Sequence, residues 1–265
     1  MQKRPRLIPE VAHARTKLTQ ALENAGISSG DRVVLAVSGG SDSLALALAM
    51  SFVGPKLGIE SQVVVVDHDL QEGSAQISLK AAATCKEVGL ADSKVVKVAV
   101  KQNGDGLEAA ARTARYEVLE KARQSISAKA ILLAHTKDDQ AESVMLGLVR
   151  GSGLASIAGM AAWDPERFLL RPFLGLAKTE LRSALSANGI SYWEDPHNQD
   201  PKFKRVAVRQ ALTQLEESLG PGIVQALSQT ADIAREAQDF ISLQAASLLE
   251  QIRVSEGQYR LTQLE

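Results

Sequence analysis

The sequence lacks most of the features that mark an exported, membrane-bound or metal-cluster protein. Its 265 residues include one cysteine, Cys85, which excludes an internal disulfide and a multi-cysteine zinc or iron–sulfur site. The longest apolar run, Leu44–Gly54, is well short of the roughly 20 residues that cross a bilayer. No apolar stretch follows the basic residues near the start, as it would in an export signal. We therefore expect a cytoplasmic protein without a membrane span.

An excess of charge of either sign is also absent. A formal net charge of −1 at pH 7 does not suit a general nucleic-acid binder, because phosphate neutralisation supplies most non-specific affinity. Basic residues gather in two places, residues 3–17 and 202–209. Any RNA contact should therefore be local, and an ordinary solvated surface is the favoured interpretation of the first cluster.

What the sequence does contain is an alternation of strand and helix patterns. Strands are predicted at residues 32–37, 63–66, 95–98 and 130–134. Helices are predicted at residues 11–25, 44–50, 74–88, 107–123 and 138–150. This order is typical of an α/β fold, a doubly wound parallel sheet with helices on both faces and a ligand crevice outside the carboxyl ends of the strands.

The pattern loosens after residue 153. A short strand at 168–170 and a helix at 178–188 are predicted, and everything from Val206 onward looks helical. We expect an N-terminal helical extension, an α/β domain and a small helical C-terminal domain, with bounds 1–30, 31–205 and 206–265.

The segment Ser38-Gly39-Gly40-Ser41-Asp42-Ser43 joins the first strand to a helix. In such a turn the backbone N–H groups, the serine hydroxyls and the helix N-terminus can all face an anion, and glycine allows a close approach. The lysine of a Walker-type phosphate loop is missing. Asp42 instead places a carboxylate beside the phosphates, which suits a Mg²⁺ ion held across a pyrophosphate. An ordinary βα turn with a serine N-cap is the alternative.

Polar residues also follow two other predicted strands. Asp67 and His68 come after the second strand, and His135 comes after the fourth. With Ser38, these residues sit just past the strand ends, where the crevice is expected. His135 could orient a nucleotide or help to move a proton, or it could be a satisfied polar residue. From the residues alone, His68 and Lys178 are interpreted as structural.

Two predicted helices carry polar residues whose spacing places them on one face. Arg112 and Arg115 follow Glu108 at helical spacing and could reach a nucleotide or RNA phosphate, with a surface ion pair between Glu108 and Arg112 as the alternative. Asp139 and Glu142 lie three residues apart, and two carboxylates suit a cationic amine. A solvated acidic helix N-terminus is the alternative for this pair.

The sequence resembles the tRNA(Ile)-lysidine synthetase family of N-type ATP pyrophosphatases. The loop at residues 38–43 is the signature of that superfamily, and further matching segments follow in order at 66–70, 106–116, 133–143, 150–154, 171–174 and 193–209. Gln71, Thr136, Ser143 and Ala207 depart from the usual family residues. The resemblance implies adenylation of the wobble cytidine of tRNA(Ile) with a CAU anticodon. The ε-amine of lysine then displaces AMP to leave lysidine, and codon reading changes from AUG to AUA.

The resemblance also implies roles for individual residues. For ATP binding it implies the loop 38–43 with Asp67, His68, Arg112 and Arg115, and for catalysis Asp42, His135 and Asp139, with Asp42 as the Mg²⁺ ligand. For L-lysine binding it implies Asp139, Glu142 and Arg205. For tRNA binding it implies Arg150, Trp193, Arg205 and Arg209, although Trp193 is interpreted more readily as packing at the domain junction. A homodimer is a further expectation.

Three other functions are compatible with the loop. An ATP-dependent tRNA thiolase of the same superfamily would need cysteines for a cluster or persulfide, and Cys85 stands alone. An amide-forming or NAD-forming synthetase would adenylate a carboxylate. A non-catalytic adenine-nucleotide-binding module would not require Asp42 together with the Asp139 and Glu142 pair. Lysine-dependent AMP release separates all four interpretations.

Overall fold

The computed structural model describes residues 8–69, 73–98, 107–151, 153–195, 204–255 and 258–259. Packing divides the chain into two compact units, and each is described here by itself. The first consists of Met1–Asp139 with Ala162–Val206, and the second of Gln140–Ala161 with Ala207–Glu265. The domain bounds expected from the sequence stay a prediction.

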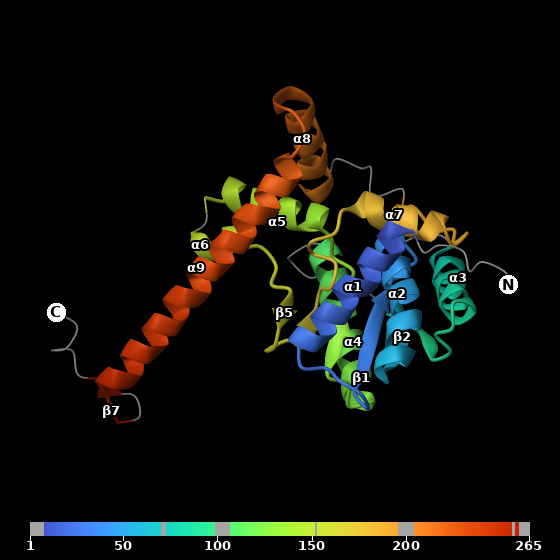
Figure 1. Ribbon diagram of the computed structural model, residues 1–265, viewed down its shortest axis with the longest axis horizontal. Coiled ribbons are helices and arrows are strands. Elements are labelled where there is room, and N and C mark those ends of the chain that lie inside the picture. Colours follow the sequence, from blue (N-terminus) through green and yellow to red (C-terminus); the bar gives the residue numbers. More distant parts are fainter. Residues whose placement is uncertain are drawn as a thin grey trace. The chain divides into compact units, whose positions relative to one another are not determined.

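A six-stranded sheet forms the centre of the first unit (Figure 1). Its strand order is β3 (Ser93–Lys97), β2 (Glu60–Asp67), β1 (Arg32–Val37), β4 (Ala130–Leu132), β6 (Leu169–Leu170) and β5 (Trp163–Asp164). The first five strands run parallel, with Arg32 opposite Glu60 where β1 and β2 begin, and β5 joins antiparallel at the edge. The predicted fold class is confirmed. The edge strand β5 was not predicted, because two residues are too few to show a strand period.

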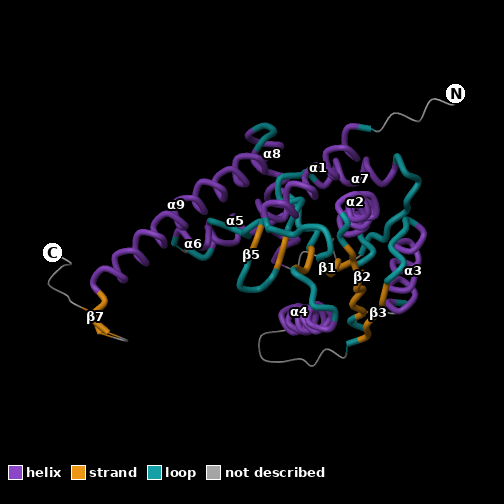
Figure 2. The backbone as a smooth tube through the Cα atoms, turned by 60° about the horizontal axis from the view of Figure 1, so that its bottom comes forward, coloured by secondary structure: helices purple, strands orange, loops and turns teal. Residues whose placement is uncertain are grey.

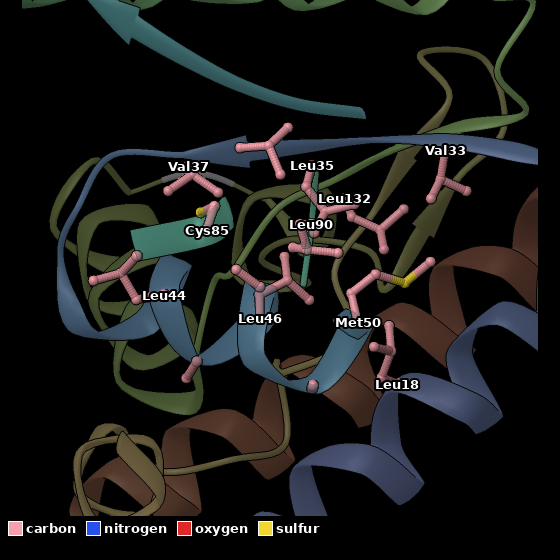
Figure 3. Packing of buried hydrophobic residues seen from close by; sticks show 14 of the residues in the cluster. Leu18, Val33, Leu35, Val37, Leu44, Leu46, Met50, Cys85, Leu90 and Leu132 are labelled. Atoms are coloured by element: carbon pink, nitrogen blue, oxygen red, sulfur yellow. The ribbon is translucent and has the colours of Figure 1, made fainter. Parts of the chain in front are cut away.

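Alternate side chains of β1 enter two different hydrophobic cores. Val33, Leu35 and Val37 are buried in the larger core, whereas Val34 is buried in a smaller one with Ile131 of β4. Successive side chains of a strand point to opposite faces, so both faces of the sheet are covered. Figure 3 shows the β1 side chains of the larger core together with residues of the neighbouring helices.

Helices cover both faces of this sheet, as the sequence predicted. The larger core is built with α1 (Pro9–Asn24), α2 (Ser41–Leu57), α3 (Ser74–Glu87) and α7 (Lys178–Ser186). The smaller core is built with α4 (Leu107–Ser125), which Figure 2 shows on the other side of the strands from α1, α2 and α7. The core position Leu46 of α2 is fully buried, and burial of one such side chain contributes about 2 kcal/mol.

The second unit is mainly helical. It contains most of α5 (Lys137–Val149), α6 (Leu154–Ile157), most of α8 (Lys204–Leu219) and α9 (Ile223–Ile252). Arg235 of α9 donates through Nη2 to the carbonyl oxygens of Ala158 and Gly159, at 2.9 and 2.7 Å, and so satisfies the C-terminal end of α6. None of the helices in the described ranges has the length and apolar character that a bilayer crossing requires.

A short hairpin follows α9 where the sequence predicted only helix. Its strands are β7 (Arg253–Ser255) and β8 (Gln258–Tyr259), which pair antiparallel. Val254 and Tyr259 are residue types that favour strands. Strands of two and three residues are too short for their period to compete with the long helical pattern before them.

Candidate active site

The carboxyl ends of three neighbouring strands bring the predicted site residues of the first unit to one edge of the sheet. β1 is followed by Ser38, β2 ends at Asp67 and is followed by His68, and β4 is followed closely by His135. β1 lies between β2 and β4, so the chain leaves it on one side for β2 and later returns on the other side as β4. Such a switch point in strand order is where open α/β sheets bind their ligands.

The loop from Ser38 to Gly40 is held rigidly before α2 begins. The hydroxyl of Ser43 donates to the carbonyl oxygen of Gly40 at 3.0 Å and accepts from the backbone N–H of Ser38 at 3.2 Å. The N–H of Trp193 donates to the carbonyl oxygen of Gly39 at 3.0 Å. These hydrogen bonds hold the loop in place, and α2 begins directly after it. A fixed loop that leads into a helix N-terminus is the arrangement expected of an anion site.

Gly39 is required by the backbone of this loop, and its replacement by alanine tests that requirement. Its φ is +86°, and an added Cβ would lie 3.2 Å from the Cβ of Ala81. We expect Gly39→Ala to lower the free energy of unfolding by about 2–3 kcal/mol, since left-handed strain and crowding add. Gly73→Ala is the matched control, because Gly73 has a φ of +81° with open space around it. This substitution should lower the free energy of unfolding by only about 1 kcal/mol. Urea denaturation measures both, and equal losses would contradict the crowding argument.

Asp42, in the first turn of α2, is the main carboxylate of the loop. Its Oδ1 accepts from the hydroxyl of Ser41 at 2.8 Å, and its Oδ2 lies 3.3 Å from Nζ of Lys178. Burial raises the pKa of Asp42 above its ordinary value, Lys178 and Ser41 act to lower it, and Asp139 acts to raise it. The buried carboxylate is therefore stabilised by a nearby cation.

The residues present fit a Mg²⁺ ion that arrives with a nucleotide. In the part of the chain that the structure describes, no group of three or more His, Cys, Asp or Glu side chains is arranged to hold a metal. Mg²⁺ is commonly held by one or two carboxylates together with substrate phosphates and water. Asp42 is such a carboxylate, and because burial disfavours its charged form, a cation beside it, Lys178 here or a metal ion, stabilises it.

Arginine side chains surround the ends of β2, β4 and β6. Arg115 donates through Nε to Nε2 of His68 at 3.2 Å, and Arg112 donates to the Tyr116 hydroxyl at 3.3 Å. Arg171, which directly follows β6, is buried and has a side-chain hydrogen bond with Tyr116. The predicted partner of Arg112, the Glu108 side chain, lies outside the described side chains. Cations so placed favour an anionic ligand at this edge.

His135 is neutral at physiological pH. Burial is the main cause that lowers its pKa to about 4, and Arg171, Arg112 and Arg205 lower it further, while Asp139 raises it. Its Nδ1 is buried and has no hydrogen-bond partner among the described residues. A neutral imidazole can accept a hydrogen bond or a proton. His135 can therefore orient a nucleotide or help to move a proton, as the sequence suggests.

The lowered pKa of His135 makes stability depend on pH in a defined direction. The ordinary pKa of 6.5 applies to the unfolded chain, which therefore takes up a proton before the folded chain as the pH falls from 6.5 to about 4. As the pH falls through that range, protonation of His135 should lower the free energy of unfolding by about 2 kcal/mol, allowing for the partial exposure of the side chain. His135→Asn should flatten the pH dependence of urea unfolding. An unchanged slope of the free energy of unfolding against pH in His135→Asn would contradict the assignment.

The first turn of α5 uses its acidic residues to fix the backbone. Thr136 and Asp139 form a capping box, in which the Thr136 N–H donates to Asp139 Oδ2 at 2.8 Å and the Asp139 N–H donates to the Thr136 hydroxyl oxygen at 3.4 Å. The Thr136 hydroxyl also donates to Asp139 Oδ2 at 2.9 Å. Asp138 Oδ2 accepts the backbone N–H of Lys178 at 2.9 Å and so ties α5 to α7. Thr136, a departure from the family pattern, therefore has a structural role at this helix start.

Glu142, the second carboxylate of the predicted lysine site, belongs to the second unit. It is 2% exposed, and its Oε1 accepts from Nε of Arg209 at 2.7 Å. Glu142, predicted to bind lysine, and Arg209, predicted to bind tRNA, thus form an ion pair with each other. A lysine amine at Glu142 would have to share this carboxylate with Arg209 or displace it.

The remaining predicted residues lie at the ends of elements. Arg150 is exposed directly after α5, and Arg205 lies in the first turn of α8 close enough to influence the pKa of His135. Sequence reasoning gave no site role to Lys178 or Arg171. The signal for Arg171 was its place directly after a strand, whereas the contact of Lys178 with the loop becomes visible only in three dimensions.

Comparison with known proteins places this geometry in a family. The PP-loop domain profile matches residues 11–216. The tRNA(Ile)-lysidine synthase of Leifsonia xyli subsp. xyli is 47% identical over 227 residues, which covers 84% of this chain and 68% of that protein. The chain belongs to the tRNA(Ile)-lysidine synthase family. Another lysidine synthase, from Thermobifida fusca, is 45% identical over 245 residues, covering 92% of this chain and 74% of that protein.

A solved structure confirms the fold that this lysidine synthase family member adopts. The U34-tRNA thiolase NcsA from Methanococcus maripaludis, with its [4Fe-4S] cluster, matches with a TM-score of 0.70 and 17% identity, covering 86% of this chain and 80% of that one. At this identity the likeness concerns the fold alone. Cys85 is buried, which raises the pKa of its thiol to about 12, and it is the one cysteine of the sequence. This chemistry favours the lysidine synthase interpretation over the thiolase alternative.

Proposed function

We propose that this protein ligates lysine to the wobble cytidine of tRNA(Ile) with a CAU anticodon, at the expense of ATP. The observation that carries the proposal is the Ser-Gly-Gly-Ser-Asp-Ser loop at the switch point of the sheet, in a chain 45–47% identical to lysidine synthases. Family membership makes it an ATP-dependent ligase. A cytoplasmic location and a homodimer stay predictions.

In the adenylation step, the loop and the N-terminus of α2 would hold the phosphates of ATP through N–H groups and serine hydroxyls. The carbonyl oxygen of cytidine attacks the α-phosphorus, and pyrophosphate leaves. Asp42 would hold Mg²⁺, which supplies charge neutralisation to the leaving pyrophosphate. Arg115 lies beside His68 and Arg112 lies beside Tyr116, and both would add positive charge at the same edge.

In the ligation step, the lysine ε-amine must lose a proton before it attacks the adenylated base and displaces AMP. Asp139 and Glu142, three residues apart on α5, would hold the amine between two carboxylates. The resemblance to the family also assigns Arg205 to lysine binding. His135, neutral because its pKa is about 4, would accept a hydrogen bond from the amine rather than carry a positive charge against it.

The tRNA contacts are assigned to Arg150, Trp193, Arg205 and Arg209. Arg150 is exposed and available to a phosphate, whereas Arg209 is already paired with Glu142. Trp193 is joined through its backbone to Gly39. A tRNA bound against Trp193 would therefore lie next to the phosphate loop.

Lysine-dependent AMP release tests the proposal. Purified protein is incubated with Mg²⁺, labelled ATP and unmodified tRNA(Ile), with and without lysine. The proposal expects pyrophosphate release with tRNA present and AMP release only when lysine is added. AMP release driven equally by a sulfur donor or by ammonia would instead support a thiolase or an amide-forming synthetase.

A further inference from the structure

The phosphate loop has no lysine of its own, but a lysine reaches it from another helix. Nζ of Lys178, on α7, lies 3.3 Å from Oδ2 of Asp42, which directly follows the first residue of α2. The two side chains are 29% and 18% exposed. The ammonium therefore lies beside a residue of the loop and could supply the positive charge that a Walker-type loop takes from its own lysine.

Helix stability does not explain a lysine at this position. Lys178 is the first residue of α7, where the positive end of the helix dipole disfavours a cation. The helix start is satisfied by carboxylates instead, since Asp138 accepts the N–H of Lys178 at 2.9 Å and Glu180 accepts the N–H of Ala177 at 3.2 Å. A residue that opposes its own helix dipole is expected to serve another purpose.

The position of Lys178 is set by packing on both sides. Leu181 and Leu185 of α7 are buried in the same core as the apolar residues of α2. Its backbone N–H is fixed by the first turn of α5 through Asp138. The backbone of Lys178 is therefore fixed at a point from which its side chain reaches the loop.

We propose that Lys178 is a phosphate-binding residue of the ATP site. In the free protein it neutralises Asp42. When ATP is bound, with or without Mg²⁺, the ammonium contacts an oxygen of its pyrophosphate portion. This inference rests on the ATP use in the proposed function, but it is independent of which acceptor is adenylated.

ATP binding without Mg²⁺ separates this role from a purely structural ion pair. Affinity for ATP is measured by calorimetry in EDTA, without tRNA or lysine, in the wild type, Lys178→Met, Asp42→Asn and the double variant. Lys178→Gln repeats the test with a polar neutral side chain, and a thermal unfolding scan of each variant establishes that it is folded. Lys56→Met is the charge-matched control, because Lys56 is exposed in the last turn of the same helix α2.

The proposal expects Lys178→Met and Lys178→Gln to weaken ATP binding by about 10-fold or more, as loss of a charged hydrogen bond does. The loss should be as large in the Asp42→Asn background, because the ammonium contacts the phosphate itself. Unchanged affinity, loss confined to chains that retain Asp42, or an equal loss in Lys56→Met would each overturn it. If ATP binds normally but no lysine is incorporated into tRNA, the substrate assignment fails and this inference stands.

Discussion

Asp42→Asn is expected to reduce tRNA-dependent pyrophosphate release by about 1000-fold, the effect of removing a metal-binding carboxylate from a phosphoryl-transfer site. The amide keeps the size of the side chain and an oxygen that can accept from the Ser41 hydroxyl. The folded state should survive, because burial already disfavours the charged form of Asp42, as its raised pKa shows. The measurement is the initial rate of pyrophosphate release at saturating ATP and tRNA.

Glu60→Gln provides the matched control for this variant. Glu60 lies at the beginning of β2, at the opposite ends of the strands, and pairs with Arg32 at 2.8 Å in an exposed position. Loss of such a surface pair lowers the free energy of unfolding by less than about 1 kcal/mol. It should leave the rate of pyrophosphate release unchanged. If Asp42→Asn releases pyrophosphate as fast as Glu60→Gln, Asp42 does not hold the metal.

Asp139→Asn and Glu142→Gln are expected to raise the KM for lysine by about 10- to 100-fold, because each removes a charge-assisted contact to the amine. Pyrophosphate release with tRNA in the absence of lysine should stay within a few-fold of wild type. Both replacements keep an acceptor oxygen, so the bonds from Thr136 and from Arg209 can persist. The two variants therefore remove the negative charge without removing the Thr136–Asp139 capping box or the Arg209–Glu142 hydrogen bond.

Glu236→Gln is the control for the second pair, since Glu236 is an exposed carboxylate on α9. It should leave the lysine KM unchanged. An unchanged KM in both Asp139→Asn and Glu142→Gln would show that these carboxylates serve the structure alone, with Asp139 capping α5 and Glu142 binding Arg209. A raised KM in Glu142→Gln only would confine the amine site to that residue.

The sequence predicted the fold because its signals are local. The β-branched run of β1, the glycines that follow it and the helix formers of α2 each specify structure within a few residues. The sequence alone therefore places the strand ends that carry Ser38, Asp67 and His135 on one edge of the sheet. The order of the strands around β1 then confirmed that these residues follow neighbouring strands.

The electrostatic pairings of the site could not be predicted, because they join residues distant in the sequence. Lys178 reaches Asp42 through the packing of α7 against α2, and Arg209 reaches Glu142 through the packing within the second unit. Neither pair has a spacing that sequence periodicity can detect. The capping box of Thr136 is different, because its two residues are only three apart and the Thr-x-x-Asp motif can be read in the sequence. The family pattern alone marks Thr136 only as a departure.

The most direct test of the central claim is incorporation of labelled lysine into unmodified tRNA(Ile) with a CAU anticodon, with ATP and Mg²⁺ present. Methionine tRNA, which shares the anticodon, is the control substrate. The account predicts lysine incorporation that requires ATP and is selective for tRNA(Ile). Pyrophosphate release on a different acceptor, with no lysine entering tRNA(Ile), would contradict it.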